Sequence, residues 1–510
     1  MTYGEANQKL DILVINPGGR EKVYQQLGND LTAIEPPLWS RLIAGYVRDR
    51  GYSVEILDSE ALNMGSERVA ETVAQKAPTL TVMVVFGHQP SASTQMMVGA
   101  GETCQKIKEL APDSPILIVG GHVSALPEQT ITEEAVDFVC KGEGPVTVVQ
   151  LMEVLKSDPS ETIDWSTVQG LVWRRDDGEV VINPSAPLIN DLDNDLHGMT
   201  WDLLPMEKYR AHNWQCFGDD QSRMPYASIY TSLGCPYKCT FCCINAPFDI
   251  NRQRMRSAES VVKEIDHLYR TYGVKTFKII DEMFVLNQRH VFAICDGIIE
   301  LGYADELNFW AYSRVDTVKP HMLEKLRKAG IRWLALGIES GSKHVRDGSE
   351  KQLKAHDIKQ VVSDIQKADI SVLGNYIFGL PDDTLETMRE TLDLAIELNC
   401  EFANFYSAMA YPGSPLYRDA VKNGWALPAT WAGYSQHSYE CLPLPTETLP
   451  AAEILKFRDE AFHEYFAQPH YLDMVTQRFG WETREHIKDM ARHRLRRLIV
   501  EELEKENSLV

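Results

Sequence analysis

Short apolar segments alternate with helix-forming segments along most of the chain, and this alternation restricts the fold more than any other feature. In the first series the apolar segments are residues 10–15, 53–57, 80–86, 115–119 and 136–139. Nearly continuous apolar strands separated by helices are typical of a parallel sheet covered on both faces. Five such strands predict an α/β, doubly wound domain of the flavodoxin-like (Rossmann-type) kind.

A second alternating series lies further along the chain. Its apolar segments are residues 226–232, 276–280, 307–312, 333–338, 371–378 and 405–409. Six strand–helix units predict a partial (β/α)6 barrel, in which the carboxyl ends of the strands carry the chemistry.

The segments around these two series set the expected domain boundaries. Residues 168–182 have the pattern of a hairpin with Asp-Asp-Gly at its turn, and residues 184–195 are rich in Pro and Asp, as in a linker. The pattern beyond residue 411 is mostly helical. We therefore expect a first domain at 1–155, a hairpin and linker at 156–220, a barrel at 221–415 and a small helical C-terminal region at 416–510.

The charge balance and the short apolar segments exclude several classes of protein. The chain has 51 Lys and Arg against 73 Asp and Glu, a net charge of −22, whereas nucleic-acid binding depends on clustered cations. Residues 1–9 are polar and the first apolar segment is too short for a signal peptide. No apolar segment approaches the roughly 18 residues of a membrane span. We expect a cytoplasmic protein that binds neither nucleic acid nor membrane.

Cysteines cluster directly after the first barrel strand. Cys235, Cys239 and Cys242 have the spacing Cys-x3-Cys-x2-Cys, on a loop with Gly234 and Pro236. Three thiolates at this spacing can bind three irons of a [4Fe–4S] cluster and leave the fourth iron open to a small molecule. The alternative is a structural zinc ion, which takes four ligands. Cys243 is available as the fourth, but adjacent residues on an extended loop point in opposite directions and no His follows at ligand spacing, so the cluster is favoured.

This cysteine loop resembles the signature of the radical S-adenosylmethionine (SAM) superfamily, and residues at successive strand ends support the resemblance. Asp281-Glu282 end the second barrel strand, where the family carries a carboxylate for the SAM amino group. Ser313-Arg314 end the third, where polar residues reach the SAM carboxylate or ribose. The resemblance implies SAM contacts for Phe241, Glu282, Ser313, Arg314, Glu339 and Phe378. Each residue alone also has an ordinary explanation, such as a helix cap or a turn.

The first domain has glycine-bearing segments after its strands, where open α/β sheets bind ligands. The set resembles the cobalamin-binding domains of cobalamin-dependent radical SAM enzymes. It implies cobalamin contacts for Pro17, Gly87, Gly120, Gly121, His122, Gly142 and Glu143. The Asp-x-His-x-x-Gly motif that supplies a histidine to cobalt in many such domains is absent. We therefore expect His122 to lie near the corrin or within the loop fold, and His88 to be a loop histidine.

The resemblance implies an enzyme with a [4Fe–4S] cluster, SAM and cobalamin as cofactors. It would cleave SAM reductively, abstract a substrate hydrogen and methylate an unactivated carbon of a small molecule or natural product. A one-electron donor such as flavodoxin or ferredoxin would be its partner. The alternative enzyme is a cyclase or rearrangement enzyme similar to the anaerobic magnesium-protoporphyrin ester cyclase. A non-catalytic sensor or carrier would not need the open iron. Trp425, Trp431 and Tyr434 either line a substrate pocket or pack beside the barrel.

Overall fold

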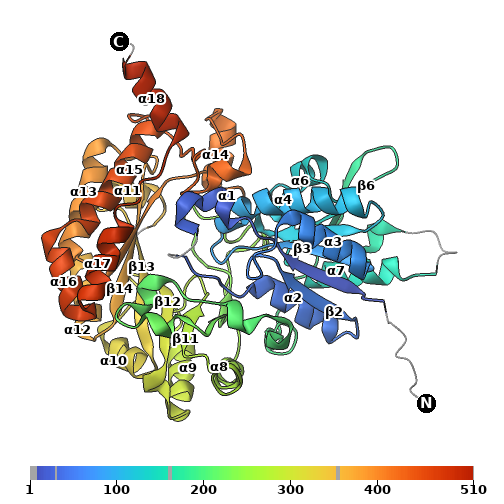
Figure 1. Cartoon of the computed structure of the whole chain (residues 1–510), viewed down its shortest axis with the longest axis horizontal. Coiled ribbons are helices and arrows are strands. Elements are labelled where there is room, and N and C mark those ends of the chain that lie inside the picture. Colours follow the sequence, from blue (N-terminus) through green and yellow to red (C-terminus); the bar gives the residue numbers. More distant parts are fainter. Residues whose placement is uncertain (1–8, 29–31, 159–163, 352–356, 509–510) are drawn as a thin grey trace. The chain divides into compact units, whose positions relative to one another are not determined.

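The computed structural model describes residues 9–28, 32–158, 164–351 and 357–508 (Figure 1). Contacts within the chain divide it into two compact units. The first contains Met1–Arg20, Pro36–Pro205 and Cys243–Ile250; the second contains Glu21–Glu35, Met206–Cys242 and Asn251–Val510. In the described part of the chain, no helix is both long and apolar enough to cross a membrane.

The first unit is built on a seven-stranded sheet in the order β2-β1-β3-β4-β5-β6-β7. Its strands are β1 (Ile12–Asn16), β2 (Val54–Asp58), β3 (Leu80–Val85), β4 (Ile116–Gly120), β5 (Phe138–Cys140), β6 (Leu171–Arg174) and β7 (Val180–Ile182). The first five are parallel in the order 2-1-3-4-5, which confirms the flavodoxin-like prediction. The hairpin β6–β7 pairs antiparallel with β5 and lengthens the same sheet.

Helices follow the parallel strands of this sheet. They are α2 (Leu38–Arg48), α3 (Ser66–Lys76), α4 (Ala92–Leu110), α5 (Gly121–Ala125), α6 (Pro127–Glu133) and α7 (Pro145–Leu155). Strands β1, β3, β4 and β5 are buried along their whole length. This burial explains why these segments are nearly continuous apolar runs rather than alternating ones.

The second unit contains a parallel six-stranded sheet in the order β15-β14-β13-β12-β11-β8. Its strands are β8 (Tyr226–Ile229), β11 (Thr276–Ile279), β12 (Asn308–Arg314), β13 (Ile331–Glu339), β14 (Ser371–Phe378) and β15 (Phe402–Ser407). The short strands β9 (Ser232–Leu233) and β10 (Arg254–Met255) form a separate pair. The six parallel strands confirm the partial barrel expected from the sequence.

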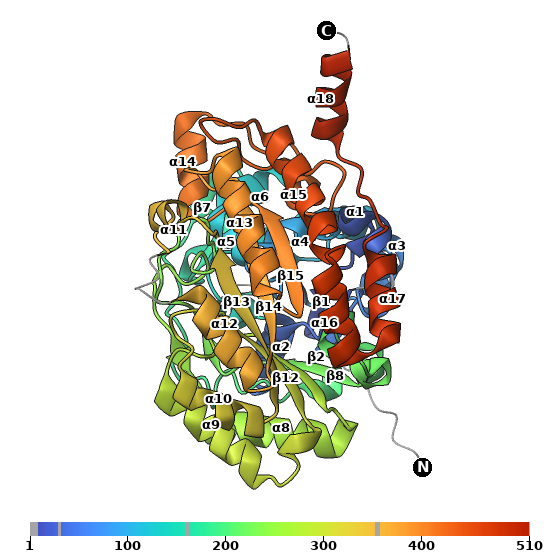
Figure 2. The same ribbon diagram turned by 90° about the vertical axis from the view of Figure 1, so that its left-hand side faces the viewer.

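The helices of the second unit cover the outer side of this sheet, as Figure 2 shows for α10, α12 and α13 in front of β13 and β14. The barrel helices are α8 (Ala258–Tyr272), α9 (Gln288–Glu300), α10 (Pro320–Lys328), α11 (Lys343–Gly348), α12 (Ile358–Lys367) and α13 (Leu385–Leu398). The short helix α1 (Arg20–Tyr24) spans the boundary between the two units. The C-terminal helices are α14 (Pro415–Asn423), α15 (Ala451–Phe466), α16 (Pro469–Phe479), α17 (Trp481–Met490) and α18 (Leu498–Ser508).

The two faces of the barrel sheet have different neighbours. Trp214 packs against Trp310 and Trp333 with ring centroids 5.2 Å apart in both pairs, and so fills the inner side near the start of the strands. On the opposite side Phe378 packs against Phe457 of α15 at 5.0 Å. Because successive side chains of a regular strand point to opposite faces, these contacts place Trp310, Tyr312 and Arg314 of β12 on the inner side and Phe378 of β14 on the helix-facing side.

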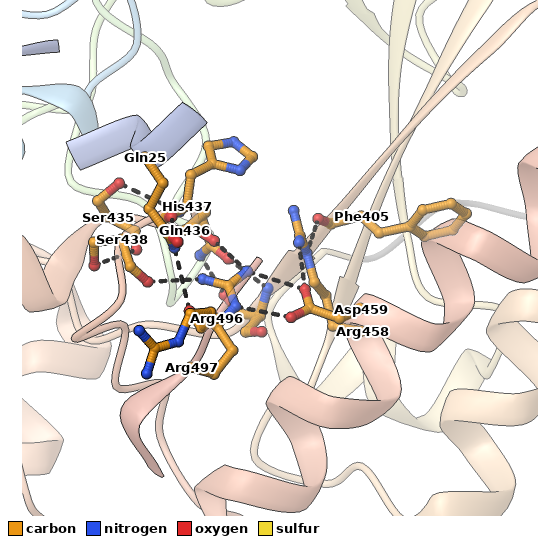
Figure 3. Close-up of polar contacts among 11 residues, drawn as sticks. Gln25, Phe405, Ser435, Gln436, His437, Ser438, Arg458, Asp459, Arg496 and Arg497 are labelled. Carbon is orange, nitrogen blue, oxygen red and sulfur yellow. Dashed lines mark hydrogen bonds and ion pairs between the residues drawn. The ribbon is translucent and has the colours of Figure 1, made fainter. Parts of the chain in front are cut away.

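A buried arginine network orders the C-terminal region beside β15 (Figure 3). The Arg497 guanidinium donates to both carboxylate oxygens of Asp459, at 2.8 and 3.0 Å, and to the carbonyls of Gln436 and Ser438, at 2.9 Å each. The Gln436 carboxamide in turn accepts from the Ser407 N–H at 2.9 Å and donates to the Ser407 carbonyl at 2.8 Å. The network therefore supplies hydrogen bonds to the end of the edge strand β15.

Candidate active site

The cysteine loop is tied to the neighbouring strand by a buried carboxylate. Asp281, which follows β11, accepts hydrogen bonds from the Thr231 N–H and Oγ1 at 2.6 Å each and from Ser232 Oγ at 2.5 Å. Thr231 and Ser232 lie between β8 and Gly234, where a φ of +83° begins the loop. Asp281 therefore fixes the direction in which the chain enters the cysteine loop.

Cys235 is buried and Cys239 and Cys242 are half-buried, all on this one loop. Burial raises the pKa of the Cys235 thiol to about 11 and also raises that of Cys239. Without a metal, these two cysteines are therefore thiols. A bound metal ion deprotonates its thiol ligands, so they would be thiolates with a metal bound. Cys243 is buried, with its pKa raised to about 12.

An aromatic residue within the loop stacks on a strand-end arginine. The Arg314 guanidinium lies 4.0 Å from the Tyr237 ring centroid and donates to the Asp316 carboxylate at 2.9 Å. Its Nη1 lies 3.9 Å from Cys239 Sγ. Arg314 therefore places a fixed positive charge beside one of the three cysteines.

The remainder of the loop is anchored on both sides. The Thr240 N–H donates to the Ser349 carbonyl at 3.3 Å, and the Leu416 N–H at the start of α14 donates to the Thr240 carbonyl at 2.9 Å. Phe241 packs against a cluster that includes Val345, Leu380 and Ala408. The structure thus brings Phe241 next to Leu380, in the turn that follows β14.

Glu282 differs from its neighbour Asp281 because one of its carboxylate oxygens accepts no hydrogen bond from the described residues. Its Oε2 atom is buried and has no hydrogen-bond partner among the described residues. Burial, assisted by the charge of Asp281, raises the Glu282 pKa to about 8. A buried acceptor without a donor indicates a site for a ligand that brings one.

The other SAM residues expected from the sequence divide between the two faces of the barrel sheet. Arg314 is in register with Gly337, Asn375 and Asn404, in the row that lies on the inner side. Ser313 and Phe378 lie on the helix-facing side, where Phe378 also stacks on Phe405 at 5.7 Å. The structure therefore brings Arg314 together with the cysteine loop but does not bring Ser313 or Phe378 to that side.

Glu339 ends β13 and forms an ion pair with Lys351, a residue that the sequence pattern did not single out. Both side chains are buried, and Glu339 has a φ of +66°, which is unusual for a residue other than glycine. Lys351 follows α11 in a polar, irregular segment, and no spacing rule would have identified it.

Among the residues that the structure describes, no group of three or more His, Cys, Asp or Glu side chains is arranged to hold one metal ion.

The aromatic residues after the barrel pack as core residues. Tyr434 is buried in a cluster with Met409, Cys441 and Leu455, and Trp431 packs on the same cluster. Trp425 packs against a second cluster at the start of α14. These contacts match the packing interpretation of the three aromatic residues.

In the first unit, the glycine-bearing segments lie at the carboxyl ends of parallel strands, as expected. Asn16 at the end of β1 donates to the Asp58 carboxylate at 2.8 Å, and the Gly18 N–H donates to Ser59 Oγ at 2.8 Å. A Cβ atom at Gly99 of α4 would lie 1.7 Å from the Gly18 carbonyl oxygen. Glycine at this position therefore lets α4 approach the segment Pro17–Gly19 closely.

The glycines after β3, β4 and β5 differ in their surroundings. A Cβ atom added at Gly87 would lie 2.3 Å from the Ala92 Cβ. One added at Gly120 would lie 2.4 Å from the Val85 carbonyl oxygen, so both glycines allow close packing. At Gly121 the nearest atom is Ser93 Oγ, at 3.5 Å. Gly142 has a φ of +134° and no atom within 4 Å of the Cβ position, so it leaves open space at the end of β5.

Two residues expected at the corrin are held by the protein. His122 is buried, its Nδ1 lies 3.2 Å from Thr94 Oγ1, and burial lowers its pKa to about 3, so the imidazole is neutral. Buried Glu143 accepts a hydrogen bond from the Ile189 N–H at 2.9 Å. These contacts give His122 a place within the loop fold and give Glu143 a structural partner.

Two domain models match this chain. The B12 binding domain matches residues 26–152, and the Radical SAM superfamily matches residues 229–395. The chain therefore has a B12-binding domain followed by a radical SAM domain, the arrangement of the cobalamin-dependent radical SAM enzymes. The two domains imply a [4Fe–4S] cluster, SAM and cobalamin as cofactors.

Individual relatives agree with this assignment. An uncharacterized methyltransferase of Pyrococcus horikoshii is 28% identical over 84% of this chain and 86% of its own length. The anaerobic magnesium-protoporphyrin IX monomethyl ester cyclase of Cereibacter sphaeroides is 26% identical over 78% of this chain and 62% of its own length. The radical SAM methyltransferase TsrM of Kitasatospora setae has the same fold, with a TM-score of 0.66 over 95% of this chain and 99% of that one, at 18% identity.

The described residues fit these cofactors. The buried Glu282 oxygen without a donor suits an ammonium group, and Arg314 beside Cys239 suits a carboxylate, as SAM carries both. The open space at Gly142, at the end of β5, suits a ligand bound at the carboxyl ends of the parallel strands. The cluster cysteines, by which we mean Cys235, Cys239 and Cys242, remain the candidate ligands of the iron–sulfur cluster.

Proposed function

We propose that this protein is a C-methyltransferase that transfers a methyl group to an unactivated carbon of a small-molecule substrate. The observation that carries the proposal is the pairing of a B12-binding domain with a radical SAM domain in a chain that aligns along 86% of a methyltransferase relative. When bound, the cluster would supply an electron to cleave SAM, SAM the hydrogen-abstracting group, and cobalamin the methyl group.

The protein's own side chains would bind and orient SAM at the carboxyl ends of the barrel strands. Glu282 Oε2 would accept a hydrogen bond from the SAM ammonium and so gain the donor that it lacks. Arg314, held by Tyr237 and Asp316, would pair with the SAM carboxylate. Phe241 would support the adenine ring from the cysteine loop.

His122 would help to hold the loop that binds cobalamin rather than bind the cobalt. Cobalamin, when bound, would supply the methyl group. His122 is neutral, buried and directed to Thr94 within its own unit.

Ring formation is the second candidate, supported by the 26% identity to the magnesium-protoporphyrin ester cyclase. That relative extends well beyond the aligned region, since only 62% of its length is covered. Both candidates would use the cofactors that the two domains imply, and only the products separate them.

The test is anaerobic reconstitution followed by mass spectrometry of products from candidate small molecules. Electrons would come from flavodoxin or ferredoxin, or from dithionite in their place. Methylation should form one S-adenosylhomocysteine and one 5′-deoxyadenosine per product, and methyl-deuterated SAM should label the product. A product formed with 5′-deoxyadenosine but without S-adenosylhomocysteine or added methyl mass would favour ring formation.

A further inference from the structure

Lys351, which lies outside the strands, extends its side chain to the end of β13. Lys351 is 5% exposed, and its ammonium forms an ion pair with the carboxylate of Glu339, which is 7% exposed. Burying two charges costs several kcal/mol per ion, and apolar side chains of similar size often give a more stable protein. Stability alone therefore does not explain why this pair is present.

The backbone around the pair makes room for it. A Cβ atom at Gly337 would lie 2.5 Å from Lys351 Nζ and 2.6 Å from Glu339 Oε1. Any residue other than glycine at this position would displace the pair. Glu339 itself has a φ of +66°, and such strained backbone persists only where the surrounding structure holds it.

The segment that carries Lys351 also contacts the cysteine loop and the strand end. The Ser349 carbonyl accepts the Thr240 N–H at 3.3 Å, one residue after Cys239. The Arg346 guanidinium donates to the carbonyls of Ser340 and Gly341, directly after Glu339. Residues 346–351 therefore connect the end of β13 to the cysteine loop through three separate contacts.

The Lys351 ammonium lies on the same side of the barrel sheet as Arg314. The Cβ position of Gly337, which is 2.5 Å from Lys351 Nζ, belongs to the inner row of side chains, and Gly337 is in register with Arg314. Arg314 Nη1 lies 3.9 Å from Cys239 Sγ. Lys351, which follows α11, and Arg314 of β12 therefore bring two cations from two different elements to the side of the strand ends that Arg314 shares with the cysteine loop.

We propose that Lys351 is a positioning residue of the radical SAM site, which holds the Glu339 carboxylate at the end of β13 and adds a second cation, after Arg314, on the side of the sheet where the cysteine loop lies. This inference rests on the proposed function, because it assigns the cysteine loop to a cluster. A cation beside a thiolate ligand favours the state of the cluster with the greater negative charge, which is the reduced state. A fixed Glu339 carboxylate would accept hydrogen bonds from the hydroxyl groups of SAM.

The experiment compares the reconstituted full-length enzyme with its K351M and K351R variants. The midpoint potential of the cluster is measured by redox titration with electron paramagnetic resonance detection, and SAM affinity by equilibrium dialysis of labelled SAM. K351M should have a more negative potential and bind SAM about tenfold more weakly, the effect of leaving one buried partner unpaired. K351R should restore both values. The control is K359M, which removes an exposed lysine from a surface pair with Glu397 on the same barrel.

Three outcomes would overturn the inference. One is a folded K351M enzyme with unchanged potential and SAM affinity, and another is a K351R enzyme as impaired as K351M. If K351M does not retain its cluster, the K351M/E339Q double variant decides, because it removes both charges of the pair. Its potential should then be close to that of the wild type while SAM binding is weakened, and wild-type SAM affinity would overturn the inference. Failure of the wild-type protein to bind a cluster or to cleave SAM would instead refute the proposed function.

Discussion

The Glu282 carboxyl allows a test in which stability and ligand binding should change in opposite directions. Burial raises its pKa to about 8, against a reference value of 4.5. A carboxyl whose pKa is higher in the folded chain binds its proton more tightly when folded. Folding stability should therefore rise as the pH falls from about 8 toward 4.5, and it should be lowest above pH 8.

The size of the effect follows from this pKa difference. Each pH unit above 4.5 costs about 1.4 kcal/mol until the folded carboxyl ionises, which gives about 3 kcal/mol at pH 7. The Glu282 side chain as a whole is half-buried, although its Oε2 atom is buried. Solvent screening of its exposed part reduces the cost to about 2 kcal/mol. Glu282→Gln keeps the shape and removes the charge, so the variant without SAM should melt roughly 2–5 °C higher at pH 8. Its melting temperature should also vary less with pH than that of the wild type.

The same substitution should weaken SAM binding. Glutamine cannot offer the buried ammonium site a charged acceptor, and a charge-assisted hydrogen bond contributes about 1.5–3 kcal/mol, or about 10–100-fold in affinity. The assays are differential scanning calorimetry of the reconstituted protein without SAM and equilibrium dialysis of labelled SAM. Glu300→Gln, an exposed carboxyl on α9, is the matched control. A Glu282→Gln variant that is less stable, or that binds SAM as tightly as the wild type, would refute the reasoning.

Four further predictions test other parts of the molecule. Alanine at any of the cluster cysteines should abolish the cluster absorbance, and Cys243→Ala should retain it; loss in the Cys243 variant would refute the ligand assignment. Asp281→Asn should lower the unfolding free energy by about 2–4 kcal/mol in urea, because several charge-assisted hydrogen bonds weaken; an unchanged midpoint would contradict this. The cobalamin-loaded Co(II) protein should show no nitrogen superhyperfine splitting, and splitting that disappears in His122→Ala would prove the opposite. Asp459→Asn should cost about 3–5 kcal/mol, since it leaves buried Arg497 without its counter-charge, and a smaller loss than that of an exposed Asp would argue against the network.

Much of the fold could be predicted because buried parallel strands leave a direct record in the sequence. Strand β4 is apolar and buried at every position, and β3 is broken only by the buried Thr81. The membership of residues 21–35 in the second unit could not be predicted. That segment is held by contacts with residues hundreds of positions away, such as the Gln25 hydrogen bond to the His437 carbonyl at 2.8 Å. Hydrogen bonds between residues so far apart in the chain leave no pattern in the local sequence.

The candidate site was predicted less completely, because a strand-end motif does not specify which face a side chain occupies. The family resemblance implies SAM contacts for both Ser313 and Arg314, yet their side chains point to opposite sides of the sheet. Only the register between β12 and β13, together with the position of Trp214 on the inner side, distinguishes them. The contact of Lys351 with Glu339 could not be predicted either, because Lys351 lies in an irregular segment whose sequence has no periodicity from which a neighbour could be inferred.

The adjacent carboxylates Asp281 and Glu282 show how the structure separates two roles that the sequence presents together. Both follow β11, and either could serve as the family's strand-end carboxylate. Asp281 accepts its hydrogen bonds from Thr231 and Ser232, so its charge is committed to the entry of the cysteine loop. Glu282 retains a buried oxygen that lacks a donor among the described residues. Thr231 and Ser232 therefore determine the two roles, because they donate hydrogen bonds to the Asp281 carboxylate and leave the Glu282 carboxylate available to a ligand.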